Sequence, residues 1–141
     1  MKAFSIKQPY ANKILTGLKT IELRSWQTTY RGDLLICTSR APALFLKKLQ
    51  EVDRDGRNKV VDKEYGDEDY MYFGKALFVV ELYDVAPMKK KDEVDADAIF
   101  SKDLFSWHLR NVRPIKPFDV KGKLGFFDVD EPVVFLKRET A

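Results

Sequence analysis

The stretch Gly17-Leu18-Lys19-Thr20-Ile21-Glu22-Leu23-Arg24-Ser25-Trp26 carries the side chains with the clearest chemical potential. An ammonium, a carboxylate, a guanidinium and an indole follow one another closely: Lys19, Glu22, Arg24 and Trp26. Such groups can bind phosphate, hydrogen-bond the edge of a base and stack against an aromatic ring. Ile21 and Leu23 alternate with polar residues, which predicts a strand over 20–26 with its polar side chains on one face. That face is either a solvated edge or the floor of a polar pocket.

Each of these residues also has a purely structural interpretation. Lys19 and Glu22 could form an ion pair at the start of a strand, although exposed pairs contribute only about 0–1 kcal/mol. Strict alternation places the two side chains on opposite faces, so a bend after Gly17 is needed to bring them together. Arg24 could lie across Trp26 in a cation–π contact, with the tryptophan in the core. We favour a pocket for Lys19 and Glu22 and leave both interpretations of Trp26 open.

Further candidates lie later in the chain. Glu81 interrupts the most hydrophobic stretch, 75–85. A carboxylate there is either solvated or buried with a partner and able to act as a base. Four basic residues are candidates for contacts to phosphate, and equally for solvated surface charges: Arg110, Arg113, Lys121 and Lys123.

The composition excludes several kinds of site. His108 is the only histidine and Cys37 the only cysteine, so a histidine cluster or a deaminase-type zinc site cannot be built. Cys37 lies in an apolar run and is expected to be a buried thiol and not a nucleophile. Gly122-Lys123-Leu124-Gly125 lacks the spacing of a phosphate-binding loop. No metal or other cofactor is expected.

The net charge of +3 is unevenly distributed over the 141 residues. Residues 1–50 carry nine basic residues against two acidic ones, 51–69 carry four against eight, and 107–123 carry five against one. If the two basic segments meet in space, they create a field suited to phosphates. No apolar run approaches the roughly 20 residues that span a bilayer. With a single cysteine as well, a cytoplasmic protein without a membrane partner is expected.

Apolar patterning predicts the elements that position these residues. Strands are expected at 2–6, 20–26, 34–38, 75–85, 105–112, 115–120, 124–129 and 133–136. Helices are expected at 10–17, 42–52 and 96–100, and the polar segment 53–73 is irregular. There is too little helix for βαβ crossovers. The order therefore predicts one domain over 1–141 that is mainly β with short helices (α+β), a small antiparallel barrel flanked by two or three helices.

Three motifs in this order resemble the ASCH domain family, which belongs to the PUA-like β-barrels. The first is Ser5-Ile6-Lys7-Gln8-Pro9-Tyr10-Ala11. The second is Gly17-x-Lys19-x-x-Glu22-x-Arg24-x-Trp26, followed by Tyr30-Arg31-Gly32. The third is Trp107-His108-Leu109-Arg110-Asn111-Val112-Arg113-Pro114-Ile115, with Lys121-Gly122-Lys123-Leu124-Gly125-Phe126-Phe127. The resemblance covers both ends of the chain and little of 41–74.

The resemblance implies an RNA-binding or nucleoside-binding cleft between the first helix and the barrel. The binding residues that it implies are Lys19, Glu22, Arg24, Trp26, Gln8, Tyr10, Arg110 and Arg113. We expect RNA or a modified nucleoside as the ligand, while the sequence identifies no protein partner.

The same resemblance leaves other functions open. One bacterial subfamily hydrolyses acetylcytidine with a lysine, a threonine three residues later and a downstream glutamate. Lys19 and Glu81 match two of these positions, but Glu22 stands in place of the threonine, and Thr20 lies one residue from the lysine. If the chain is an amidohydrolase, its catalytic residues are therefore expected among Lys19, Glu22 and Glu81. Another member is described as a ribonuclease, and a protein-interaction domain in a regulatory assembly is the third alternative.

Overall fold

The computed structural model describes residues 1–40, 50–52, 58–60 and 72–136. The helix expected at 42–52 lies outside the described residues except for its last three. There the prediction is wrong, because these residues form strand β4 (Gln50–Val52), which pairs antiparallel with β5 (Asn58–Val60) in a separate two-stranded sheet.

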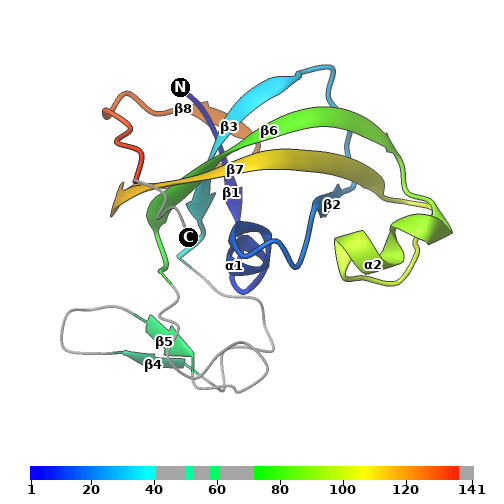
Figure 1. Ribbon diagram of the computed structural model, residues 1–141, viewed down its shortest axis with the longest axis horizontal. Coiled ribbons are helices and arrows are strands. Elements are labelled where there is room, and N and C mark those ends of the chain that lie inside the picture. The colour runs from blue at the N-terminus through cyan, green and yellow to red at the C-terminus, as the bar shows by residue number, and fades with distance from the viewer. Residues whose placement is uncertain (41–49, 53–57, 61–71, 137–141) are drawn as a thin grey trace, which may run out of the picture.

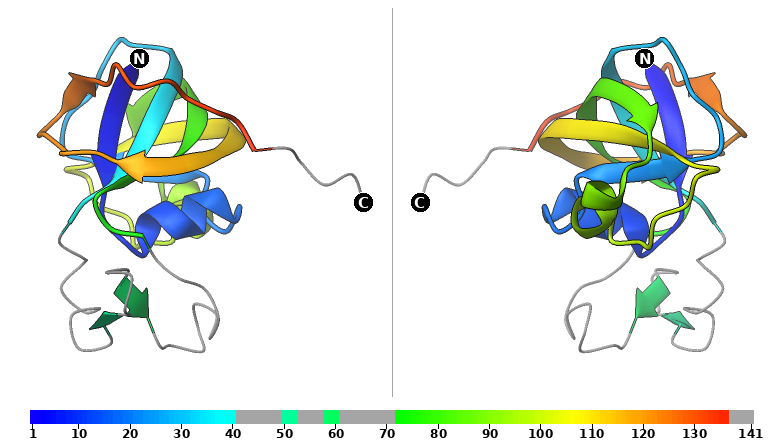
Figure 2. Two further views of the ribbon diagram at one scale, coloured as in Figure 1. Left: turned by 90° about the vertical axis from the view of Figure 1, so that its left-hand side faces the viewer. Right: turned by 90° about the vertical axis from the view of Figure 1, so that its right-hand side faces the viewer.

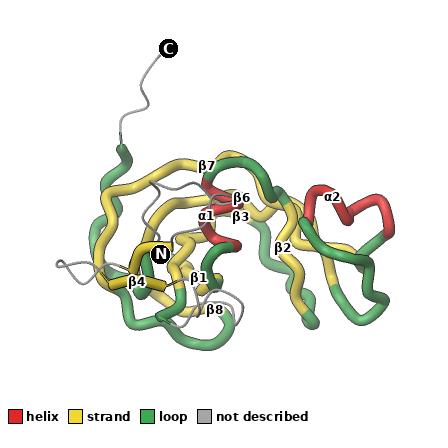
Figure 3. Tube along the Cα trace, turned by 90° about the horizontal axis from the view of Figure 1, so that it is seen from below, coloured by secondary structure: helices red, strands yellow, loops and turns green. Residues whose placement is uncertain are grey.

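Six further strands form one mixed sheet in the order β2-β7-β6-β3-β1-β8. β1 and β3 are parallel, and the other neighbours are antiparallel. The strands are β1 (Lys2–Ile6), β2 (Ile21–Arg24), β3 (Gly32–Thr38), β6 (Lys75–Pro87), β7 (Phe105–Asp119) and β8 (Phe126–Asp128). Figures 1 and 3 show the long β6 and β7 running side by side, and Figure 1 shows α1 at the end of β1 and α2 on the side of β2.

The sheet is strongly curved but is not a closed barrel (Figure 2). The predicted mainly β fold with few short helices is confirmed, whereas closure is not found. The edge strands β2 and β8 have four and three residues, and no ladder joins them among the described strands. Aromatic side chains meet there instead: the rings of Trp26 and Phe126 lie 5.6 Å apart. Short edge strands with bulky residues between them leave little room for backbone hydrogen bonds.

The two faces of the sheet bury separate apolar clusters. Inside the curve, Phe4, Phe78 and Trp107 pack with residues of α1 (Tyr10–Leu15). On the outer face, Leu35, Val79 and their neighbours are covered by the segment that follows β7. Cys37 belongs to this outer cluster, and burial raises the pKa of its thiol to about 12. The predicted burial of Cys37 is confirmed.

Strand β7 corrects the prediction of two strands over 105–120. It is continuous because Asn111 adopts a φ of 57° and a β-bulge shifts the register opposite Val79 and Glu81, which accommodates the Asn-Val-Arg-Pro break without ending the ladder. The strand expected at 124–129 is confined to Phe126–Asp128. The strand expected at 133–136 is reduced to one bridge, Ile115 to Phe135.

The connection between β6 and β7 also differs from the prediction. A 3₁₀ turn, η3 (Lys90–Asp92), leads into α2 (Glu93–Ala96), earlier than the helix expected at 96–100. The Asp92 carboxylate accepts hydrogen bonds from the Lys89 N–H and the Ser106 hydroxyl, each at 2.9 Å. Asp97, with a left-handed φ of 53°, ends the helix. None of the helices in the described ranges has the length and apolar character that crossing a membrane requires.

Candidate ligand-binding pocket

A pocket of about 870 Å³ is lined in part by residues of strands β1 and β2. Its walls come from β1, α1, β2, residues 39–40, the end of α2 at 96–98 and the loop 121–125. The volume falls within the range of small-molecule sites, about 300–1,000 Å³. Segments from both basic regions of the sequence therefore line one cavity.

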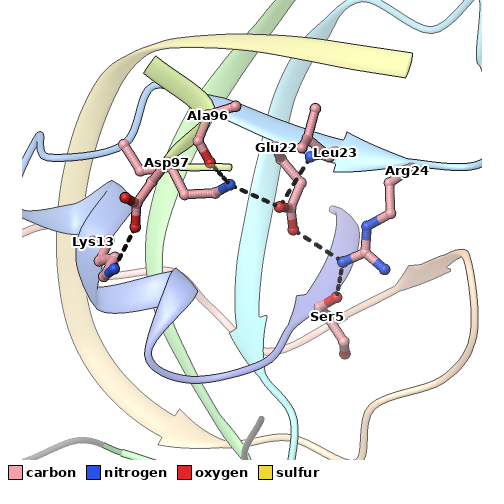
Figure 4. Close-up of polar contacts among 8 residues, drawn as sticks. Ser5, Lys13, Glu22, Leu23, Arg24, Ala96 and Asp97 are labelled. Carbon is pink, nitrogen blue, oxygen red and sulfur yellow. Dashed lines mark hydrogen bonds and ion pairs between the residues drawn. The ribbon is translucent and has the colours of Figure 1, made fainter. Parts of the chain in front are cut away.

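Glu22 lies at the centre of a charged group in this pocket (Figure 4). Its Oε1 lies 3.6 Å from the Lys19 Nζ, and its Oε2 accepts a hydrogen bond of 3.1 Å from the Arg24 Nη2. The Leu23 N–H also donates to Oε1, at 3.2 Å. The side chains of Lys19 and Glu22 are only 4% and 9% exposed, and that of Arg24 is 30% exposed. One carboxylate thus partly neutralises two cations in a largely desolvated site.

The proximity of Lys19 and Glu22 depends on the turn before β2. Gly17 has a φ of 85°, which a residue with a side chain rarely adopts, and the Lys19 N–H then donates to the Lys13 carbonyl. Because β2 begins only at Ile21, Lys19 precedes the strand and does not obey its alternation. The predicted bend is confirmed.

Lys19 also contacts the opposite wall of the pocket. Its Nζ donates to the Ala96 carbonyl at 2.7 Å and lies 5.6 Å from the centre of the Tyr10 ring. Burial lowers the pKa of Lys19 below its ordinary 10.5, although the nearby Glu22 carboxylate acts in the other direction. At the rim, Lys13 forms an ion pair with Asp97 (Figure 4). Lysines before β2 therefore hold the end of α2 against the pocket.

Arg24 forms the side of the pocket next to β1. Its Nη2 donates to the Ser5 carbonyl at 3.1 Å, and its guanidinium carbon lies 4.4 Å from the centre of the Phe4 ring. The Arg24 Nε and the Ser5 Oγ are both buried without a hydrogen-bond partner. Buried polar atoms are rarely left unpaired, so this side of the pocket retains hydrogen-bonding capacity.

Trp26 is half-buried and belongs to both the core and the pocket. Its ring packs edge-on against Trp107 at 4.7 Å and Phe4 at 6.1 Å, and its carbonyl accepts a hydrogen bond from the Trp107 indole. The same residue lines the pocket. The two interpretations of Trp26 are therefore compatible.

Positive charge predominates around the pocket. Two acidic residues line it, Glu22 and Asp97, against six basic ones: Lys7, Lys19, Arg24, Arg40, Lys121 and Lys123. An excess of cations in a concave site attracts anions and raises their local concentration.

Four predicted site residues lie outside the lining of this pocket. The Gln8 side chain is fully buried and bonds to Asn12 and to the Tyr72 carbonyl. Val80 and Leu82 point into the inner cluster, so Glu81 projects from the other face. There Glu81 pairs with Arg110 at 2.6 Å, and Arg113 pairs with Asp33 at 2.6 Å.

The sequence did not indicate that the end of α2 and the loop 121–125 line this pocket. The Ala96 carbonyl carries no signal in the sequence, since any residue could supply it. In the loop 121–125, Lys121 and Lys123 were predicted as candidates for phosphate contacts, but their position beside Lys19 and Arg24 was not. Within the described ranges, no three His, Cys, Asp or Glu side chains are grouped in a way that could hold a metal ion.

A sequence model of the ASCH domain matches residues 4–119. No curated protein matches the chain. The matched region includes Lys19, Glu22 and Arg24 but ends before the loop 121–125. Since the match covers most of the 141 residues, the chain belongs to the ASCH domain family.

Proposed function

We propose that this pocket recognises a single nucleobase, presented by RNA or by a modified nucleoside. The observation that carries the proposal is the enclosure of Lys19, Glu22 and Arg24, the core of the family resemblance, in a cationic pocket that Trp26 also lines. RNA bases outside a duplex are commonly recognised by hydrogen bonds to their edges and by stacking on aromatic rings. The pocket offers both kinds of contact.

Each side chain has a distinct role in this proposal. Arg24 donates hydrogen bonds to acceptor atoms on the base edge. Its guanidinium is oriented by the hydrogen bond that it donates to the Ser5 carbonyl. Glu22 accepts from an amino or imino group, and Lys19 supplies positive charge at the inner end. Trp26 provides an aromatic surface for the base.

Binding measurements with matched variants test the proposal. We expect Arg24→Ala and Lys19→Met to weaken binding of a short single-stranded RNA, or of a panel of nucleosides, by about tenfold or more. Arg110→Ala is the control, since Arg110 also pairs with a glutamate and stacks on an aromatic ring but lies outside the pocket. An equal loss in all three variants, each shown to be folded, contradicts the proposal and indicates that binding extends over the face of Arg110.

A specific observation supports hydrolysis of an acylated base as a second candidate function. Burial lowers the pKa of Lys19, which increases the fraction of neutral amine able to accept a proton, and Glu22 lies 3.6 Å away. Thr20 is exposed and outside the lining, so it supplies no nucleophile there. The reaction would use water, with Lys19 or Glu22 as the general base and without Glu81.

Incubation with acetylcytidine followed by mass spectrometry tests this second candidate. Release of acetate that is lost in Lys19→Met and retained in Glu81→Gln supports it. Unchanged substrate at high protein concentration, with binding intact, leaves recognition as the function.

A further inference from the structure

We infer that the mouth of the pocket is a phosphate-binding subsite formed by Lys7, Lys121 and Lys123. The preferred ligand is then a nucleotide that carries phosphate, either within a strand or free, in place of an uncharged nucleoside. This inference rests on the proposed function, because it assumes that a base occupies the inner part of the pocket.

The inner and outer cations of the pocket differ in their partners. Lys19 and Arg24 both contact the Glu22 carboxylate. Lys7, Lys121 and Lys123 are exposed and line the same cavity, and none of them forms an ion pair with another residue in the part of the chain that the structure describes. Their charge is available to a ligand at the mouth.

Close packing holds the lysine-bearing loop on β1. A Cβ added to Gly122 would lie 2.6 Å from the Ser5 Oγ, so only glycine allows the loop to approach this closely without a shift. Gly122 separates Lys121 from Lys123, and Ser5 lies two residues before Lys7. The contact therefore gathers lysines from distant parts of the sequence at one edge of the pocket.

Lysine is well suited to this task. An ammonium group binds phosphate as a compact point charge, and an exposed cluster can exchange its hydration for phosphate oxygens at modest cost. A base in contact with the inner wall would leave its sugar and phosphates toward the mouth, where the three lysines lie. Lys7 lies within the region that matches the family model, whereas Lys121 and Lys123 lie just beyond its end at residue 119.

The test compares nucleosides with their 3′,5′-bisphosphates. Cytidine, uridine, adenosine, guanosine and acetylcytidine are titrated by calorimetry, each with and without the phosphates, at one low ionic strength. For the wild-type protein, we expect the bisphosphates to bind at least about tenfold more tightly. In Lys121→Ala/Lys123→Ala most of that gain is lost, while the affinity for nucleosides changes less than about twofold.

Lys102→Ala/Lys116→Ala is the matched control, since it removes the same charge from two exposed lysines outside the pocket. Gly122→Ala provides a second test, because its added Cβ clashes with the Ser5 Oγ and forces a shift at the contact between the loop and β1, while no lysine is removed. We expect the control to keep the phosphate gain and Gly122→Ala to reduce it.

Two results overturn the inference in different ways. The subsite is absent, while the proposed function stands, if nucleosides bind and the bisphosphates bind no more tightly. The same conclusion follows if the control variant loses as much of the affinity gain from phosphate as Lys121→Ala/Lys123→Ala does. If neither the nucleosides nor the bisphosphates bind to the folded protein, the proposed function and the subsite fail together.

Discussion

The protein contains two groups that each combine an arginine, a glutamate and an aromatic ring, with the same distance from guanidinium to ring. Arg24 pairs with Glu22 and lies 4.4 Å from the centre of the Phe4 ring. Arg110 pairs with Glu81 and lies 4.4 Å from the centre of the Tyr83 ring. The first group lines the pocket, whereas the second lies on the other face of the sheet, where the Arg110 side chain is 60% exposed and that of Glu81 is 30% exposed.

The comparison teaches that residue types and pairing do not by themselves make a site. Around Arg110, each arginine has its own carboxylate: Arg110 forms an ion pair with Glu81, and Arg113 forms one with Asp33. In the pocket, Glu22 serves two cations, and Lys19 remains partly uncompensated in a buried position. Low exposure strengthens these interactions and makes an unpaired charge costly. The same chemical group is therefore structural in one place and available to a ligand in the other.

The largest expected difference between the two groups is in stability after loss of the carboxylate charge. Glu22→Gln leaves Lys19 buried without its anionic partner, and we expect it to lower the free energy of unfolding by about 3 kcal/mol. Glu81→Gln interrupts an exposed pair and is expected to cost less than about 1 kcal/mol. Urea denaturation of both variants measures the difference. Equal losses would show that the two groups do not differ in desolvation.

A smaller loss of stability is expected from substitution of Asp92, in the β6–β7 connection that supplies one wall of the pocket. Burial alone would raise the pKa of Asp92, but hydrogen bonds from the Lys89 N–H and the Ser106 hydroxyl outweigh it and keep the pKa below 3.8. Asp92→Ala leaves both donors without this acceptor and is expected to cost about 2 kcal/mol.

The pH dependence provides the matching test for Asp92. Because the pKa of Asp92 is lower in the folded protein than in the unfolded chain, its ionised carboxylate stabilises the fold. This stabilisation is fully present above pH 3.8 and is lost as the pH falls through the lower pKa of the folded protein. The difference in free energy of unfolding between the wild-type protein and Asp92→Asn should therefore decrease at acidic pH. An advantage that is constant between pH 6 and pH 3, as rough limits of the titration, would contradict this assignment.

The smallest effect concerns the protonation of Lys19. The lowered pKa means that between the folded-state value and 10.5 the unfolded chain binds the proton and the folded protein does not. Stability contributed by this group therefore rises with pH over that interval. We expect the wild-type protein to gain stability relative to Lys19→Met as the pH approaches 10.5. Urea denaturation at several alkaline pH values measures the difference, and Lys102→Met, which alters an exposed lysine, should show no such trend.

Local patterns in the sequence identified several elements correctly. The strand at 2–6 and the helix that ends before Gly17 follow from short-range apolar periodicity and from a glycine with a left-handed φ. The strand expected at 75–85 is β6, extended by two residues. These features depend on neighbours in the chain, so sequence patterns are sufficient to predict them.

Long-range features were predicted less well. The break at Asn-Val-Arg-Pro ends a strand when considered alone, but pairing with β6 carries β7 through it by means of a bulge. The helix at 93–96 depends on Ser106, a residue of the next strand that holds Asp92. Glu81 was a candidate base because its strand is apolar, yet the face from which it projects is decided by the packing of Val80 and Leu82.

By itself, the sequence determined that this chain is mainly β, belongs to the ASCH family, and carries Lys19, Glu22 and Arg24 close together beside a turn. Only the tertiary structure decided which charges share a cavity. It buried Lys19 against the Ala96 carbonyl, brought the loop 121–125 onto β1, and placed Glu81 and Arg110 on the opposite face. The physical reason is that burial and electrostatic compensation depend on distances through space between segments far apart in the chain, which local periodicity does not encode.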